Sequence, residues 1–241
     1  MFINETSESV NNQKIVAAID YDGIIQEICF PWIENILENT DYFKDYIDFS
    51  KLDDIEKILN IVFNRTKYLL YNSIRLENAP KPSEQFMKDF NSLYRDDPEL
   101  YLKAPYLSGL QLIWPLIKQR NTENITILSH CDNENTFNQK KEKVEKLFNG
   151  NEIVNFVGLS SNISKADWLN SNLPNWNLFI DDYPKNIKEV LDKCNCTHKT
   201  ILIPKYGYLT NNIKNLIEET ALIKNAEIGY YQPQFISTTN Y

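Results

Sequence analysis

The sequence has no long hydrophobic run. None of its apolar stretches approaches the roughly 20 residues that a helix needs to cross a bilayer. Residues 2–13 are mostly polar, without the basic start, apolar centre and small-residue cleavage site of a secretory signal. We therefore expect a cytoplasmic protein that has no membrane partner and whose mature chain begins as the sequence does.

Basic residues are outnumbered. The 25 lysines and arginines stand against 33 aspartates and glutamates, so the formal net charge is -8. A protein that binds polymeric nucleic acid normally presents a basic stripe, so we expect no such partner. A small phosphorylated substrate remains compatible, because a metal, one lysine and backbone amides can neutralise its charge locally. The oligomeric state is left open, a homodimer included.

Cysteine is scarce and shows no disulfide framework. The four cysteines are Cys29, Cys131, Cys194 and Cys196, and in a cytosolic chain they are expected to be reduced thiols. The segment from Cys194 to His198 leaves a zinc site as a second interpretation. It lacks the paired Cys-x-x-Cys spacing and an evident fourth ligand, which favours the reduced thiols.

What the sequence does contain is an apolar segment, residues 14–19, that ends in Asp20-Tyr21-Asp22-Gly23. Side chains alternate along a strand, so Asp20 and Asp22 project on the same side, and Gly23 lets the backbone turn away. Two neighbouring carboxylates repel each other unless a cation or a proton lies between them. The motif is typical of a magnesium site beside a nucleophilic oxygen, and the alternative is a solvated acidic turn.

Three further polar positions follow in a fixed order along the chain. They are Ser129 after residues 124–128, Lys165 in the helix-like stretch 164–169, and Asp181-Asp182 after residues 176–180. Each of these residues has a more common role when it is taken alone. A serine of this kind usually caps a helix, a lysine usually lies in solvent, and an aspartate pair usually marks the N-terminus of a helix. The order of all four motifs favours an active site.

Other residues compete for these roles. Lys140, Lys141 and Lys143 are rivals for the lysine, but their helix is strongly charged and we expect them on its solvated face. His130 directly follows the serine. It is either a group of the phosphate pocket or a hydrogen-bonded loop histidine.

Apolar and amphipathic segments alternate through most of the chain. This alternation predicts an α/β fold with a doubly wound parallel sheet, and the polar motifs then lie at the carboxyl ends of strands, where such sheets bind ligands. A mostly helical insertion follows the first strand, and Ser83 is expected to cap its last helix. The expected strands are residues 14–20, 124–128, 153–159, 176–180 and 200–204, and the expected helices are 30–37, 51–76, 83–95, 136–148 and 184–191.

These four motifs resemble those of the haloacid dehalogenase (HAD) superfamily of magnesium-dependent phosphatases, over roughly residues 14–204. The resemblance implies a Rossmann-like core of residues 14–29 and 105–241, with a helical cap of residues 30–104 over the active site. It implies that Asp20 is the nucleophile, forming an aspartyl-phosphate, and that Asp22 is the general acid and base.

The same resemblance assigns the remaining motif residues. Mg²⁺ would be held by Asp20, the backbone carbonyl of Asp22, and the pair Asp181-Asp182, whose direct ligand the sequence leaves open. Ser129 and Lys165 would bind the phosphate, the lysine also restraining the nucleophile.

Within the superfamily, residues 180–186 and 104–110 look most like the 5'(3')-deoxyribonucleotidase branch. Ile24 stands where many superfamily members have threonine, and this branch accepts an apolar residue there. That branch implies a nucleoside monophosphate as substrate. Aromatic residues in 30–49 would stack on the base, or else form the core of the cap. The alternatives are a phosphatase for another small metabolite, such as a sugar phosphate, and a non-catalytic binding or scaffold protein.

Overall fold

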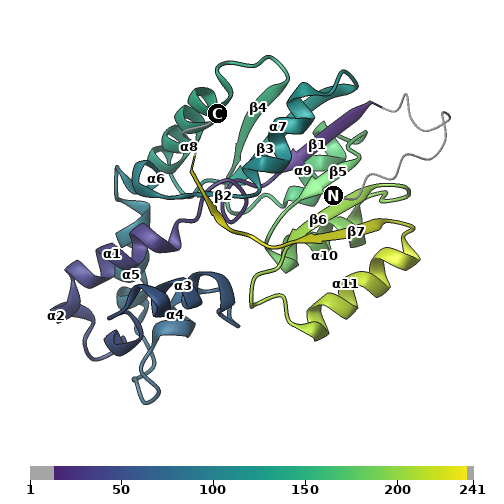
Figure 1. Ribbon diagram of the computed structural model, residues 1–241. Helices are drawn as coiled ribbons and strands as arrows, with labels where there is room; N and C mark the ends of the chain where they lie inside the picture. Colours follow the sequence, from purple (N-terminus) through teal and green to yellow (C-terminus); the bar gives the residue numbers. More distant parts are fainter. Residues whose placement is uncertain (1–13, 238–241) are drawn as a thin grey trace.

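The computed structural model describes residues 14–237, so the polar residues 2–13 lie outside it. Its centre is a parallel sheet in the order β4-β3-β1-β5-β6-β7 (Figure 1). The first strand is central, which places the end of β1 between the ends of two neighbours. The six strands are β1 (Ile15–Ile19), β3 (Thr122–His130), β4 (Val154–Leu159), β5 (Leu178–Ile180), β6 (Thr200–Pro204) and β7 (Glu227–Tyr231).

Helices cover both faces of this sheet. Along β1, Ala17 and Ile19 pack with residues of α7 (Leu110–Lys118) and α8 (Glu134–Phe148). Val16 and Ala18, on the opposite face, pack with α9 (Lys165–Asn172), α10 (Pro184–Lys193) and α11 (Asn211–Ile223). This alternation follows from the two-residue period of a strand buried on both sides. The predicted doubly wound α/β fold is confirmed.

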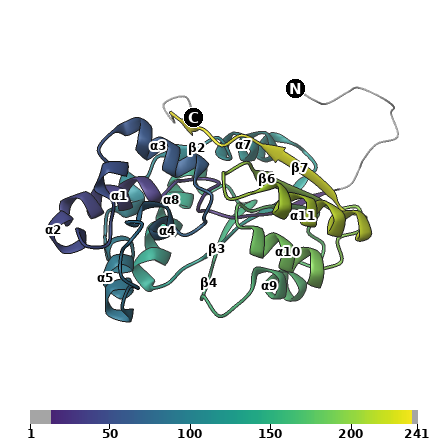
Figure 2. The same ribbon diagram turned by 90° about the horizontal axis from the view of Figure 1, so that it is seen from below.

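The predicted helical insertion after the first strand is also confirmed. We call residues 30–104 the helical region, and most of its buried side chains form a cluster of their own that includes Ile33, Val62 and Phe90. Figures 1 and 2 show its helices grouped at one end of the molecule. They are α1 (Cys29–Glu38), α2 (Thr40–Phe43), the 3-10 turn η1 (Phe49–Lys51), α3 (Ile55–Asn64), α4 (Leu70–Ile74), α5 (Glu84–Arg95) and α6 (Leu100–Lys103).

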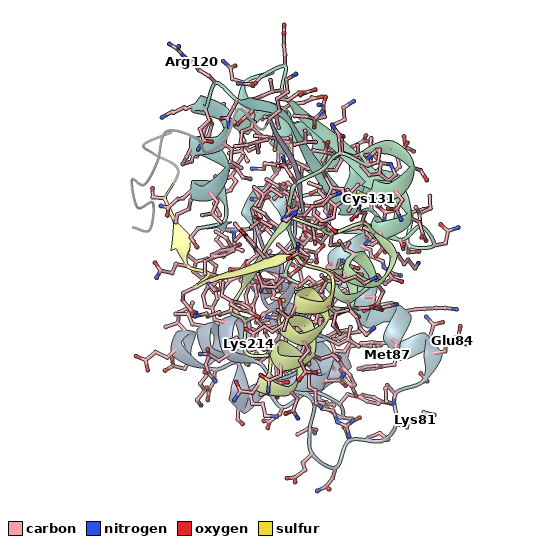
Figure 3. All side chains as sticks on the ribbon, turned by 90° about the vertical axis from the view of Figure 1, so that its right-hand side faces the viewer. Lys81, Glu84, Met87, Arg120, Cys131 and Lys214 are labelled. Atoms are coloured by element: carbon pink, nitrogen blue, oxygen red, sulfur yellow. The ribbon has the colours of Figure 1, made fainter. Side chains whose placement is uncertain are left out.

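The helical region lies toward the carboxyl ends of the strands. Arg120, just before β3 begins, is at the far end of the molecule from Lys81 and Glu84 of the helical region (Figure 3). The amino ends of the strands therefore point away from these helices. As predicted, α5 begins after a serine cap, with Ser83 Oγ accepting a hydrogen bond from the Phe86 amide at 3.0 Å.

The single helix expected over residues 51–76 is wrong. The chain forms η1, α3 and α4 instead, because Arg65 leaves the helical conformation with φ -56° and ψ 134°. At this break the amide of Gly207 donates to the carbonyl of Phe63 at 2.8 Å. A Cβ on Gly207 would lie 2.1 Å from the carbonyl oxygen of Asn64, so only glycine allows this approach. A contact with a distant segment thus ends the helix.

The end of the chain contributes two strands that the sequence pattern did not reveal. Strand β7 extends the sheet beside β6. Further on, β8 (Phe235–Ile236) pairs antiparallel with β2 (Tyr106–Leu107). The ring of Phe235 packs against Phe30 and Phe63, with centroids 6.0 and 4.9 Å away, and so joins the tail to the helical region. Strand β4, expected to be buried, is an edge strand whose residues are mostly half-buried.

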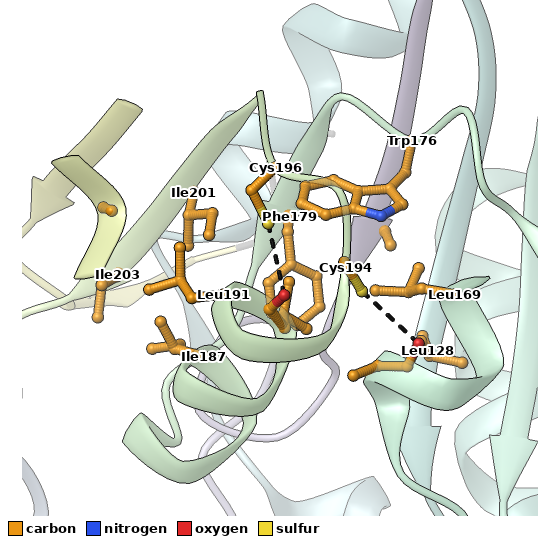
Figure 4. Close-up of a cluster of buried hydrophobic side chains, with 14 of the residues drawn as sticks. Leu128, Leu169, Trp176, Phe179, Ile187, Leu191, Cys194, Cys196, Ile201 and Ile203 are labelled. Atoms are coloured by element: carbon orange, nitrogen blue, oxygen red, sulfur yellow. Dashed lines mark hydrogen bonds between the residues drawn. The ribbon is translucent and has the colours of Figure 1, made fainter. Parts of the chain in front are cut away.

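Two of the cysteines belong to the core, so the zinc interpretation is wrong. Cys194 and Cys196 are 5% and 1% exposed, near Trp176 and Phe179 (Figure 4). Their thiols donate to main-chain carbonyls, and burial raises the pKa of Cys194 to about 11. Among residues 14–237, Cys194, Cys196 and His198 do not form a group of three potential ligands close enough to share a metal ion, which rules out the zinc site. Within residues 14–237, no helix combines the length and apolar character needed to span a membrane.

Candidate active site

The two aspartates of the first motif lie just beyond the end of β1. Ile19 pairs with Ile127 of β3 on one side and with Ile180 of β5 on the other, so Asp20 lies between two strand ends. Its Oδ1 accepts a hydrogen bond from the Tyr21 amide at 2.7 Å. The carboxyl group is buried, and this burial raises the pKa of Asp20 against the lowering effect of a nearby lysine.

Gly23 makes the close approach of the first and last motifs possible. Its φ is +73°, a conformation that residues with a side chain rarely adopt. A Cβ at this position would lie 2.5 Å from Oδ2 of Asp182. The glycine that follows the two aspartates is therefore required both by the turn and by the space that it leaves.

Lys165 joins the nucleophile candidate to the last motif. It is the first residue of α9, whose N-cap Ser164 accepts a hydrogen bond from the Asp167 amide. Its ammonium lies 2.7 Å from Oδ2 of Asp20 and 2.7 Å from Oδ2 of Asp181. Burial opposes the charge, but the two carboxylates outweigh it and raise the pKa of Lys165. This lysine is a fixed cation between two strand ends.

The two aspartates after β5 have different surroundings. Both oxygens of Asp181 are hydrogen-bonded, to Lys165, the Tyr183 amide and the Asn186 side chain. In Asp182 only Oδ2 is bonded, by the hydroxyl of Tyr208 at 2.5 Å. Its Oδ1 is buried and has no hydrogen-bond partner among residues 14–237. Burial and the neighbouring carboxylates Asp20 and Asp181 raise the pKa of Asp182.

These carboxylates fit a divalent cation. One oxygen each of Asp20, Asp181 and Asp182 lie within 4.8 Å of one another, the only such group of three potential ligands in the described part of the chain. Hard cations such as Mg²⁺ prefer oxygen ligands of this type. The unpaired Oδ1 of Asp182 is a buried acceptor that a cation would satisfy.

Lys140 is the site residue that we did not predict. We expected it on the solvated face of its helix, and that expectation is wrong, because the side chain is 1% exposed. Its ammonium bonds Asp22 Oδ2 at 2.5 Å, Ser129 Oγ at 2.9 Å and the His130 carbonyl at 2.9 Å. A signal was present, since Lys140 stands four residues before the buried Val144, on the same helix face.

Ser129 and His130 end β3 at the same edge of the sheet. Ser129 is fully buried, and Lys140 places its hydroxyl beside Asp22. His130 Nε2 lies 2.9 Å from the Ile163 carbonyl, which ties the ring to the loop before α9. The serine is thus brought to the first motif as expected, and the histidine takes part in a loop hydrogen bond at the wall of a cavity.

That cavity has a volume of about 350 Å³ and lies between the sheet edge and the helical region. Asp22, Asp182 and Lys140 line its inner wall. The outer wall comes from the helical region and its neighbours, and includes Trp32, Arg65, Tyr68, Tyr94, Arg95 and Asp132. The rings of Trp32 and Tyr94 are 4.6 Å apart, and Arg95 pairs with Asp132 at 3.0 Å. A small molecule with a charged end and an aromatic or polar body suits this space.

Comparisons with known proteins add little to this geometry. No protein-family model matches the chain, and no curated protein does. Among solved structures, a protein provisionally assigned as a beta-phosphoglucomutase from Bacteroides vulgatus aligns with 12% identity over 91% of this chain and 84% of its own, at a TM-score of 0.46. A HAD-superfamily hydrolase from Ehrlichia chaffeensis aligns with 15% identity over 89% of this chain and 99% of its own, at 0.42. TM-scores below 0.5 decide neither fold nor function, so the fold rests on the strand order described above.

Proposed function

We propose that this protein is a magnesium-dependent phosphomonoesterase of the HAD type. The observation that carries the proposal is the convergence of Asp20, Lys165 and Asp182 at one buried sheet edge, next to Asp22. Phosphoryl transfer needs an in-line nucleophile, a proton donor for the leaving oxygen, and cations around the equatorial oxygens. This edge supplies a residue for each part, in the chain order that the HAD resemblance implies.

Mg²⁺ would be held by the carboxylates of Asp20 and Asp182 and by the backbone carbonyl of Asp22. Asp182 is the better candidate of the aspartate pair, because Asp181 is saturated by hydrogen bonds whereas Asp182 has a buried free oxygen. The metal, when bound, supplies positive charge to the phosphate oxygens and lowers the repulsion between the carboxylates.

In both chemical steps Asp20 and Asp22 have separate roles. A carboxylate oxygen of Asp20 bonds to phosphorus while the bond from phosphorus to the leaving oxygen breaks, and Asp22 gives its proton to that oxygen. Asp22 next takes a proton from water, whose oxygen bonds to phosphorus as the bond to Asp20 breaks and phosphate leaves. Burial and the neighbouring Asp20 raise the pKa of Asp22, which favours the protonated form that the first step needs.

Lys165 and Ser129 would stabilise the transferring group. Lys165 neutralises negative charge beside the nucleophile and keeps the Asp20 carboxylate in one orientation. Ser129 would donate a hydrogen bond to a phosphate oxygen. The helical region, for which we keep the bounds 30–104, would act as a cap that excludes water and selects the substrate.

For the substrate we propose a nucleoside monophosphate, with a deoxynucleotide included. Trp32 and Tyr94 support this, because aromatic rings at the outer wall of the cavity suit a base beyond the phosphate. The indole nitrogen is already bonded to the Phe90 carbonyl, which leaves ring faces and edges for apolar contact. A sugar phosphate is the second candidate, because Arg95 and Asp132 are polar groups suited to hydroxyls. We place the activity in the cytoplasm.

The test is phosphate release from a panel of ribo- and deoxynucleoside 5'- and 3'-monophosphates and of sugar phosphates, with and without Mg²⁺. Release that needs Mg²⁺ and is lost in Asp20→Asn would support the function, and the preferred ester would identify the substrate class. A folded protein that binds Mg²⁺ and releases phosphate from none of these would favour the scaffold alternative.

A further inference from the structure

Arg65 is a buried arginine that forms no salt bridge with any residue of 14–237. It is 8% exposed and stands where α3 ends, in the helical region. Its guanidinium donates to three main-chain carbonyls, those of Ile61, Val62 and Tyr68. All its printed hydrogen bonds go to main-chain oxygens, and the buried Glu27 contributes only through its charge, without an ion pair among the described residues. A buried cation of this kind requires other stabilising contacts.

Those contacts come from two tyrosines that follow strand β6. The guanidinium carbon lies 5.2 Å from the ring centroid of Tyr208 and 5.9 Å from that of Tyr206. The two rings are themselves stacked, with centroids 5.2 Å apart and planes 12° apart. Both belong to the segment between β6 and α11, and both are nearly fully buried. A desolvated guanidinium over aromatic faces makes a strong cation–π contact.

Each of these tyrosines reaches the carboxylate site through its hydroxyl. Tyr206 donates to the carbonyl of Gly23 at 3.0 Å, and Tyr208 donates to Oδ2 of Asp182 at 2.5 Å. Gly23 and Asp182 approach each other closely because Gly23 has no side chain. Arg65 is therefore one side chain away from both of them.

We propose that Arg65 is a positioning residue that couples the helical region to metal binding, by holding Tyr206 and Tyr208 in the orientation that presents Asp182. The inference rests on the proposed function in one respect, namely that Asp182 binds the cation. Groups behind metal ligands fix ligand orientation, and their removal typically weakens metal binding 10- to 100-fold. A lysine cannot substitute, because it lacks the planar face that lies on the rings and the fork that meets the carbonyls.

The experiment measures Mn²⁺ binding, by electron paramagnetic resonance on the substrate-free protein, for wild type, Arg65→Met, Tyr208→Phe and the double variant. Arg65→Met is expected to bind Mn²⁺ about 10-fold more weakly. The double variant is expected to lose less affinity than the product of the two single losses, since both substitutions affect the Tyr208 hydroxyl that bonds Asp182. The matched control is Arg75→Met, at an exposed arginine of the same region, which should bind as wild type does.

Circular dichroism establishes that each variant is folded, and Arg65→Lys replaces Arg65→Met in the cycle if the latter is not. Unchanged Mn²⁺ affinity in the arginine variant, or effects of the two substitutions that multiply in the double variant, would overturn the coupling. Failure of the wild type to bind Mn²⁺ would instead contradict the proposed metal-dependent function, so the two ideas fail in different ways.

Discussion

Lys140 and Asp22 are 118 positions apart in the sequence, yet the lysine ammonium contacts Oδ2 of the aspartate at 2.5 Å. The ammonium also lies over the rings of Tyr21 and Tyr101, 5.6 and 5.2 Å from their centroids. Burial raises the pKa of Asp22, and the positive charge of Lys140 offsets only part of that rise. Lys140 thus sets both the orientation of the proposed general acid and the balance between its charged and neutral forms.

Replacing Lys140 should therefore impair the chemical step more than substrate binding. In Lys140→Met the Asp22 carboxyl loses its partner and its fixed position, and kcat is expected to fall about 100-fold, within the range of general acid–base catalysis. The loss should be smaller for p-nitrophenyl phosphate, whose leaving group needs little protonation. Steady-state kinetics with both esters measures this.

The neighbouring lysine is the matched control. Lys141 is exposed, and its ion pair within residues 14–237 is with Glu145, at 3.8 Å, so Lys141→Met should leave kcat within twofold of wild type. Equal kinetics for Lys140→Met and Lys141→Met would show that the buried contact has no catalytic importance.

Gly23 and Gly150 form a second matched pair. Both have positive φ, +73° and +66°, so an alanine at either should cost about 1 kcal/mol of stability from backbone strain. At Gly150 the added Cβ meets no atom within 4 Å, whereas at Gly23 it would displace Asp182. Gly23→Ala is expected to lose activity at least 10-fold and Gly150→Ala to keep it.

Urea unfolding and phosphate release, measured on the same preparations, separate the two effects. Full activity in Gly23→Ala would mean that the approach of the first and last motifs is unimportant for the site.

Stability should fall at high pH. Burial raises the pKa of Cys194 from its ordinary value of 9.0 to about 11, so as the pH rises the thiol ionises in the unfolded chain before it does so in the folded one. This group contributes its full share of stability below pH 9 and loses it progressively as the pH rises through about 11. The buried tyrosines Tyr206 and Tyr208, whose pKa values are also raised, act in the same direction.

The midpoint of urea unfolding is expected to decrease between pH 8.5 and about 10.5, and to decrease less in Cys194→Ala. An unfolding midpoint that stays constant over this interval would contradict the buried, protonated state of the thiol.

The sequence was sufficient for the parts of the structure that depend on local pattern. The apolar segment before Asp20, the alternation of strands and helices, and the position of Lys165 at the start of a helix are all local features. The break at Arg65 was not predictable in this way, since it depends on Gly207, a residue far along the chain. Lys140 was placed on the solvated face because its helix is rich in charged residues, although its spacing from Val144 puts it on the buried face.

Strand β7 was also not predictable from its local pattern. After the exposed Glu227 its residues are half-buried, and in the described sheet only β6 pairs with them, so no strong alternation marks the segment. The difference between Asp181 and Asp182 depends on partners such as Asn186 and Tyr208, which only the folded chain brings together. Sequence order locates the aspartate pair but cannot distinguish its members.

The proposed mechanism requires that Asp20 accept the phosphoryl group. The most direct measurement uses Asp22→Asn with p-nitrophenyl phosphate and Mg²⁺, because the good leaving group permits the first step and the lost base slows the second. After acid quench and proteolysis, mass spectrometry should find one phosphoryl group on the peptide that contains Asp20, and none when Asp20→Asn is added. If the wild type turns over this ester but Asp22→Asn yields no phosphorylated peptide, Asp20 is not the nucleophile. A phosphoryl group on another residue would equally contradict the proposed mechanism.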